Sequence, residues 1–255
     1  MSLLIDIFLF NEDNFGFLLH DEKTGLTAAI DAGDDIATKA ALKRRGWQLD
    51  EIFITHHDWD HTDGLLALKK EFGAKVTGPK AEKDKINGLD VLVSGGDIIN
   101  FGSLNFQVIK TAGHTLGHIS YFEPRGQHLF CGDALFSLGC GRMIEGNPKM
   151  MWQGLERIKQ LPSDTLIYCG HEYSKSNAIF ARHIDPNNEK LQARQKEIDT
   201  QLANSEFTIP TTLGAEKTSN PFLRCDEKII AAKMGLSENE PIEVFAALRR
   251  SKDIF

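Results

Sequence analysis

Six ionisable side chains occupy eight consecutive positions in the stretch FITHHDWDHTDG, residues 53–64. Three are histidines and three are aspartates, and they directly follow an apolar run. Imidazole nitrogen and carboxylate oxygen are ligands that zinc, iron and manganese favour. Without a cation, so many polar groups at one strand end would repel and desolvate each other. We therefore interpret four of them as metal ligands, namely His56, Asp58, Asp60 and His61.

Four ligands are more than one catalytic ion can use, because such an ion must keep a coordination position open. The cluster therefore predicts two metal ions. The other two members, His57 and Asp63, are expected to support the ligands or to face solvent. His118 is expected either to donate a hydrogen bond to a ligand or to pack in the core.

Three further candidate ligands lie far along the chain, each just after an apolar run. His114 stands in the turn TAGHTLGH, Asp133 ends the segment LFCGD, and His171 ends LIYCGH. A single His or Asp in such a place is most often a turn or capping residue. The ends of strands gather at one rim of a layered α/β fold, so these three residues are expected to join the first four.

The elements that must position these residues alternate between short apolar runs and amphipathic segments over two thirds of the chain. Helices are predicted over 34–46, 64–72 and 150–161. Strands are predicted for LIDIFLF, GFLLHD, LTAAIDAG, EIFIT, AKVTG and DTLIYCGHEY, and strand pairs within 96–113 and 118–133. With helices covering the sheet faces, this order favours a layered α/β sandwich.

After Tyr173 the sequence becomes predominantly helical. Helical patterns cover 174–184, 188–204, 225–235 and 238–253, and an extended segment is expected over 207–224. We therefore predict a catalytic domain over residues 1–173 and a helical domain over residues 174–255. No internal repeat or low-complexity tract interrupts this plan.

Composition excludes several classes of protein. A net charge of −7 and a pI near 5.7 argue against general nucleic-acid binding, which depends on neutralising phosphates. No apolar run approaches the roughly 20 residues that span a bilayer, and MSLLIDIFLF lacks a basic start, so we interpret it as the first strand. The four cysteines are scattered without a CxxC pair, as is typical of free cytoplasmic thiols. We expect a cytoplasmic protein that binds neither nucleic acid nor membrane.

The runs THHDWDH, GHTLGH, CGD and GHEY, in that order, resemble the metallo-β-lactamase superfamily. Within it the chain is similar to glyoxalase II, the family of hydroxyacylglutathione hydrolases. The similar blocks are NEDNFGF, DAGD at 31–34, GDALFSLGCGRMIEG at 132–146, NPFLR at 220–224 and RRSKDIF. The resemblance covers essentially the whole chain. It implies an αββα sandwich with metals at the rim between its sheets, followed by a helical substrate-binding domain.

The resemblance also implies individual roles for these residues. His56, Asp58 and His114 would hold one ion, Asp60, His61 and His171 would hold the other, and Asp133 would bridge them. Asp60 and Asp133 would therefore take part in catalysis. Arg142, Tyr173, Arg249 and Lys252 would bind the glutathione part of the substrate.

The activity that the resemblance implies is hydrolysis of S-(2-hydroxyacyl)glutathione, such as S-D-lactoylglutathione, to glutathione and a 2-hydroxy acid such as D-lactate. We expect a monomer that carries two divalent ions, zinc, iron or manganese. Two residues depart from the family pattern. Asp58 stands where a histidine is usual, which shifts the preference from zinc toward iron or manganese. Ile144 stands where a tyrosine is common, which leaves open which thiol carries the acyl group of the substrate.

Three other interpretations stay open at this point. Another hydrolase of the superfamily, a lactonase or a β-lactam-cleaving enzyme, would use the same metal ions, although Arg249 and Lys252 favour a glutathione substrate. An iron-dependent redox enzyme would suit Asp58, but the chain has no flavin-binding domain. A protein that only holds metal would need a closed coordination shell, whereas catalytic sites keep a position open.

Overall fold

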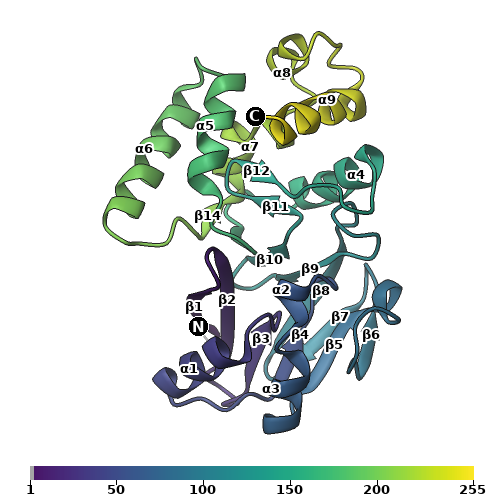
Figure 1. Cartoon of the computed structure of the whole chain (residues 1–255), viewed down its shortest axis with the longest axis vertical. Helices are drawn as coiled ribbons and strands as arrows, with labels where there is room; N and C mark the ends of the chain where they lie inside the picture. The colour runs from purple at the N-terminus through teal and green to yellow at the C-terminus, as the bar shows by residue number, and fades with distance from the viewer. Residues whose placement is uncertain (1–2) are drawn as a thin grey trace. The chain divides into compact units, whose positions relative to one another are not determined.

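The structure, a computed structural model, describes residues 3–255 of the chain (Figure 1). The chain divides into two compact units. Unit 1 comprises the residues up to Lys110 together with Thr115–Gly132, and unit 2 comprises Thr111–His114 and Asp133–Phe255. Met1 and Ser2, the start of the predicted first strand, lie outside the described residues. The predicted domain boundary at residue 173 stays a prediction.

The first sheet of unit 1 brings the ends of two neighbouring strands to one edge. Its order is β1 (Leu3–Phe10), β2 (Asn14–Asp21), β3 (Thr27–Ile30), β4 (Glu51–Phe53), β5 (Lys75–Pro79) and β6 (Val91–Val93). The first three strands pair antiparallel, and β3 to β6 pair parallel. Because parallel strands end at the same edge of a sheet, Asp31 after β3 lies beside the segment that follows β4.

Two helices pack on this sheet, α1 (Asp35–Arg45) and α3 (Leu65–Phe72), which confirms the helices predicted there. One buried cluster joins both helices to the sheet. It contains Ala41 and Leu42 of α1, Leu65 and Leu68 of α3, and the sheet residues Leu18, Ile52 and Val76. The Asp34 side chain accepts a hydrogen bond from the Ala37 amide (2.8 Å), and Gly46 ends α1 with a φ of 70°. These are the start and stop signals that define α1 in the sequence.

A second run of strands in unit 1 is antiparallel throughout: β7 (Ile98–Phe101), β8 (Leu104–Lys110), β9 (Ile119–Glu123) and β10 (His128–Gly132). Both predicted strand pairs are confirmed. Phe53 of β4 packs against this sheet, with its ring centroid 5.8 Å from that of Phe101 and 5.6 Å from that of Tyr121. The two sheets of unit 1 therefore face each other across an aromatic core.

Unit 2 contains two short strand pairs and six α-helices within the described residues. The pairs are β11 (Leu135–Phe136) with β12 (Gly139–Cys140) and β13 (Leu166–Cys169) with β14 (Thr211–Thr212). The helices are α4 (Pro148–Lys159), α5 (Ser174–Ile184), α6 (Glu189–Ala203), α7 (Leu213–Ser219), α8 (Lys228–Lys233) and α9 (Pro241–Asp253). Figure 1 shows α5 and α6 side by side, and they share a buried cluster. None of the helices described here is long and apolar enough to cross a bilayer.

The expectation of an extended segment over 207–224 is partly wrong, because α7 and a 3₁₀ helix, η2 (Pro221–Leu223), lie within it. The Thr212 hydroxyl accepts from the Ala215 amide (3.2 Å) and so caps α7. The Asn220 side chain accepts from the Phe222 amide (3.0 Å) at the next turn. Two short helices separated by a capping residue show too few turns for a helical period to be visible in the sequence.

A buried carboxylate stabilises the turn between β11 and β12. Glu216 is fully buried, and it accepts hydrogen bonds from the Leu138 amide (2.8 Å) and the Asn220 side chain (3.0 Å). Leu138 has a φ of 58°. Residues other than glycine adopt this backbone conformation only when their surroundings enforce it. Burial raises the pKa of the Glu216 carboxyl. The turn therefore depends on a side chain that lies 78 residues further along the chain.

Tyr121 provides a test of the contact between the two sheets of unit 1. Its buried hydroxyl donates to the Ile54 carbonyl (2.6 Å), and burial raises the pKa of the phenol well above its usual value. Tyr121→Phe should lower the free energy of unfolding by about 1 kcal/mol at pH 7. Urea unfolding of both proteins measures this difference.

The contribution of this contact to the free energy of unfolding should fall at high pH. An unfolded tyrosine ionises near pH 10, below the raised pKa of the folded state, so ionisation favours unfolding as the pH rises through about 10. The stability advantage of the wild type over Tyr121→Phe should therefore shrink between pH 9 and 11. An advantage that stays constant over this range would contradict the described burial.

Candidate metal centre and substrate pocket

The four candidate ligands of unit 1 follow β4, and the chain turns between them into a short helix, α2 (Trp59–Thr62), which was not among the predicted helices. His56 and His61 are buried, and their ring centroids lie 4.1 Å apart. His56 Nε2 lies 3.7 Å from Asp58 Oδ2, and His61 Nε2 lies 3.6 Å from Asp60 Oδ2. Two ligand atoms that hold one ion at about 2.1 Å stand roughly 3.4 Å apart in a tetrahedral arrangement. Each pair therefore has a spacing suited to a shared cation.

Asp31 orients both of these histidines. Its carboxylate accepts from His61 Nδ1 (2.8 Å), from the Thr55 amide (2.7 Å) and from the Thr55 hydroxyl (2.8 Å). Because the Thr55 hydroxyl gives its one proton to Asp31, it must accept from His56 Nδ1, which lies 2.9 Å away. Both rings therefore carry their proton on Nδ1, and the lone pair is on Nε2.

The role of Asp31 was not predicted from the sequence. Asp31 is the first residue of the motif DAGD, and its φ is 58° in the structure. Aspartate tolerates this left-handed conformation better than most residues. An aspartate at the end of a strand that runs parallel to the ligand-bearing strand is the signal that could have identified it.

Asn14 contacts the candidate catalytic carboxylate. Its side-chain amide donates to Asp60 Oδ2 (2.9 Å), and Asn14 itself is 4% exposed. Asn14 belongs to the motif NEDNFGF, in which nothing local to the sequence indicates this contact. A donor on one oxygen restricts how the carboxylate of Asp60 can rotate.

The other three residues considered with the motifs have different surroundings. His57 donates from Nδ1 to the buried carboxylate of Glu82 (2.8 Å). His118 is buried, with its ring centroid 4.7 Å from that of His56. Asp63 is exposed and faces solvent.

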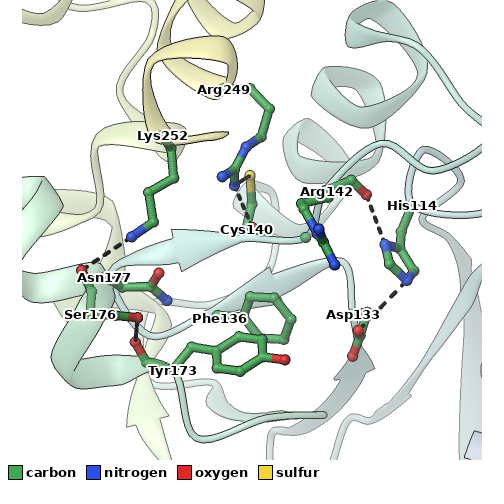
Figure 2. Close-up of a pocket in the computed structure, with 11 residues that line it drawn as sticks. His114, Asp133, Phe136, Cys140, Arg142, Tyr173, Ser176, Asn177, Arg249 and Lys252 are labelled. Carbon is green, nitrogen blue, oxygen red and sulfur yellow. Dashed lines mark hydrogen bonds and ion pairs between the residues drawn. The ribbon is translucent and has the colours of Figure 1, made fainter. Parts of the chain in front are cut away.

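In unit 2 the three distant candidates converge on one carboxylate. Asp133 Oδ2 lies 3.6 Å from His114 Nε2 and 3.3 Å from His171 Nε2 (Figure 2 shows His114 and Asp133). All three residues are at least nine-tenths buried. His114 Nδ1 donates to the Arg142 carbonyl (2.7 Å), so its lone pair is also on Nε2. One carboxylate that faces the Nε2 atoms of two imidazoles suits a position between two cations.

A pocket of about 270 Å³ in unit 2 contains all four predicted substrate-binding residues (Figure 2). Its lining includes Arg142, Tyr173, Arg249 and Lys252, together with His114 and Asp133. Tyr173 stacks its ring on that of His171, with 4.7 Å between centroids and 4° between planes. Candidate metal ligands and candidate substrate contacts thus share one hollow.

The two cations on α9 have fixed positions in this pocket. Arg249 is 4% exposed, donates to the Cys140 carbonyl (2.9 Å) and pairs with Asp253 (3.0 Å). Lys252 donates to the Ser176 carbonyl (3.1 Å). Burial and the charge of Arg249 lower the pKa of Lys252. Positive charge is therefore concentrated locally in a chain that is acidic as a whole.

Two cysteines of unit 2 and the position of Ile144 bear on the chemistry of the pocket. Burial raises the pKa of Cys140 to about 11 and that of Cys169 to about 12, so neither thiol is an effective nucleophile near neutral pH. Ile144 is 58% exposed and is outside the set of described residues that line the pocket. Neither thiol therefore supplies a nucleophile for this pocket near neutral pH.

The candidate donor atoms in both units are imidazole Nε2 and carboxylate oxygens. Such a set fits zinc, iron or manganese, whereas ions that require several thiolates would not be satisfied. The seven predicted ligands fall into a group of four in unit 1 and a group of three in unit 2. Each group converges within its own unit. That the groups together form one binuclear centre stays a prediction.

Comparison with known proteins covers the whole chain. Residues 22–171 match the family model of the metallo-beta-lactamase superfamily, and residues 172–255 match that of the hydroxyacylglutathione hydrolase C-terminus. The chain is 49% identical over 253 residues to the hydroxyacylglutathione hydrolase of Brucella ovis, which covers 99% of this chain and 98% of that protein. The same identity and coverage hold for the hydroxyacylglutathione hydrolase of Brucella abortus.

A solved structure, ETHE1 from Myxococcus xanthus, is 27% identical with a TM-score of 0.67 and covers 95% of this chain and 90% of that one. The predicted metallo-β-lactamase fold with a C-terminal helical region is thus confirmed. Members of this superfamily bind divalent metal ions, in keeping with the His and Asp clusters of both units. This chain belongs to the hydroxyacylglutathione hydrolase family within the metallo-β-lactamase superfamily.

Proposed function

We propose that this chain is a metal-dependent thioester hydrolase that cleaves S-(2-hydroxyacyl)glutathione, with S-D-lactoylglutathione as the representative substrate. The products are glutathione and a 2-hydroxy acid. The observation that carries the proposal is the pocket of unit 2, in which Arg249 and Lys252 line the same hollow as His114 and Asp133. The 49% identity to relatives named for this activity supports it over the full chain.

The proposed centre uses all seven candidate ligands. His56, Asp58 and His114 would hold one ion, Asp60, His61 and His171 would hold the other, and Asp133 would bridge the two. The spacings within the units support this assignment, because His56 faces Asp58 at 3.7 Å and His61 faces Asp60 at 3.6 Å. The carboxylate of Asp58 makes the first site harder, which favours iron or manganese over zinc there.

When bound, two divalent cations lower the pKa of water from about 15.7 toward 7 and stabilise negative charge on a carbonyl oxygen. The protein residues provide the rest. Asp60 is held on one side by Asn14 and so presents its remaining oxygen lone pairs in a fixed direction. Thiols ionise near pH 8.5, so the glutathione thiolate leaves without a strong general acid.

The helical segment 174–255 is the proposed substrate-binding domain. Arg142, Arg249 and Lys252 would pair with the carboxylates of glutathione, and Tyr173 would contact its thiol end. Charge-assisted hydrogen bonds of this kind are about twice as strong as neutral ones. We further propose that the enzyme works as a monomer in the cytoplasm and needs neither nucleic acid nor membrane as a partner.

A comparison of substrates tests the proposed reaction directly. The purified protein should hydrolyse S-D-lactoylglutathione at a far higher kcat/KM than any lactone or β-lactam, measured spectrophotometrically at equal metal content. It should consume no oxygen when loaded with iron. Preferential lactone turnover, or oxygen uptake without hydrolysis, would contradict the proposal in favour of the corresponding rival.

Removal of the proposed bridging carboxylate should greatly reduce both metal binding and turnover. Asp133→Ala leaves His114 and His171 without the group they face, so bound metal and at least about 100-fold of kcat/KM should be lost. Elemental analysis and thioester turnover measure the two losses. Asp63→Ala, which removes an exposed aspartate of the first motif, is the matched control and should match wild type. Wild-type turnover by Asp133→Ala at full metal content would refute the assignment.

Loss of a pocket cation should affect substrate binding rather than the metal centre. Lys252→Met retains the aliphatic length but removes the charge, so KM for the thioester should rise about tenfold while metal content stays unchanged. Steady-state kinetics over a range of thioester concentrations provide the measurement. Arg250→Met removes a neighbouring but exposed cation and is the control. An equal change in KM for both variants would point to general electrostatics instead of a specific contact.

A further inference from the structure

Glu82 is a buried carboxylate that has no part in the proposed metal or substrate contacts. It ends the 3₁₀ helix η1 (Lys80–Glu82) of unit 1 and is 2% exposed. Burial of a carboxylate is costly unless donors surround it. Here the donors come from two turns that are far apart in the sequence, and both turns adjoin candidate metal ligands.

The first turn contributes His57. Glu82 Oε2 accepts from His57 Nδ1 at 2.8 Å, which holds the imidazole in one orientation. His57 Nε2 lies 3.7 Å from Asp58 Oδ1, so the ring stands directly beside the carboxylate of Asp58. Because His57 lies between His56 and Asp58 in the chain, fixing its ring also restricts the backbone that carries both of these ligands.

The second turn contributes two donors to the other oxygen. Glu82 Oε1 accepts from the Gly117 amide (2.9 Å) and forms a short hydrogen bond with the Thr115 hydroxyl. Thr115 is the residue that follows His114 in the chain. A Cβ atom on Gly117 would come within 2.3 Å of Glu82 Cγ, so the close approach requires glycine at this position.

We propose that Glu82 is a positioning residue, which joins the turn of residues 56–61 to the turn after His114 and so preorganises the first metal site. The inference rests on the proposed ligands His56, Asp58 and His114. Glu82 acts only through its neighbours in the two turns and touches neither substrate nor ion. Residues of this kind typically contribute 10–100-fold to metal affinity.

The test is the rate at which the metal-loaded protein releases its ions to a chromogenic chelator. Glu82→Gln keeps one acceptor oxygen for the Thr115 and Gly117 donors but turns an NH₂ group toward His57 Nδ1–H, so that bond is lost. One of the two ions should leave about 10–100-fold faster than from wild type. In turnover, kcat should fall while KM for the thioester changes little.

Two further variants exclude a general loss of structure. Glu51→Gln alters a partly buried glutamate of β4 in the same unit and should release metal at the wild-type rate. Thr115→Val removes only the hydroxyl donor, leaves the carboxylate intact and should accelerate the same release phase to a smaller degree. It also keeps the inference testable if Glu82→Gln does not fold.

A double variant tests whether Glu82 acts through the neighbouring ring. Glu82→Gln combined with His57→Gln should release metal no faster than the faster of the two single variants, because both remove the same link. Release at the wild-type rate from both Glu82→Gln and Thr115→Val would overturn the inference. A wild-type protein that retains no metal would instead contradict the proposed function, so the two failures are distinguishable.

Discussion

A neutral histidine can offer the Nε2 lone pair to a cation only if its proton is on Nδ1, and the candidate centre depends on this constraint. Three of the four candidate histidine ligands have Nδ1 beside an identified acceptor: His61 at Asp31, His56 at Thr55 and His114 at the Arg142 carbonyl. Each acceptor belongs to a different local structure. The fold is therefore required to supply not only ligands but also the group behind each ligand.

Sheet register supplies the most important of these acceptors. Ile30 of β3 pairs with Phe53 of β4 in a parallel ladder, so the residues that follow each strand emerge side by side. Asp31 reaches the Thr55 amide for this reason, and Thr55 in turn reaches His56. The aromatic contacts of Phe53 with the facing sheet hold β4 in place beneath the cluster. The core residue Phe53 and the candidate metal ligand His56 are thus only three residues apart.

The sequence was informative wherever a function requires a dense or conspicuous pattern. The crowding between His56 and Asp63 has few explanations other than metal binding, and α1 is delimited by its own capping residues Asp34 and Gly46. Asp31, Asn14 and Glu82 could not be assigned in the same way. Each is a single polar residue whose partner lies 24 to 46 positions away, so its role exists only once strands have paired. The same limit applied to α7, which is short and stabilised by its caps.

Anomalous X-ray diffraction from crystals of the metal-loaded protein is the most direct test of the proposed binuclear centre. We expect two peaks roughly 3.5–4 Å apart, with Asp133 between them and ligand distances near 2.0–2.2 Å. One peak should contact Asp58 and the other Asp60. A single peak, or two peaks held by other residues, would contradict the proposed centre and the reaction that depends on it.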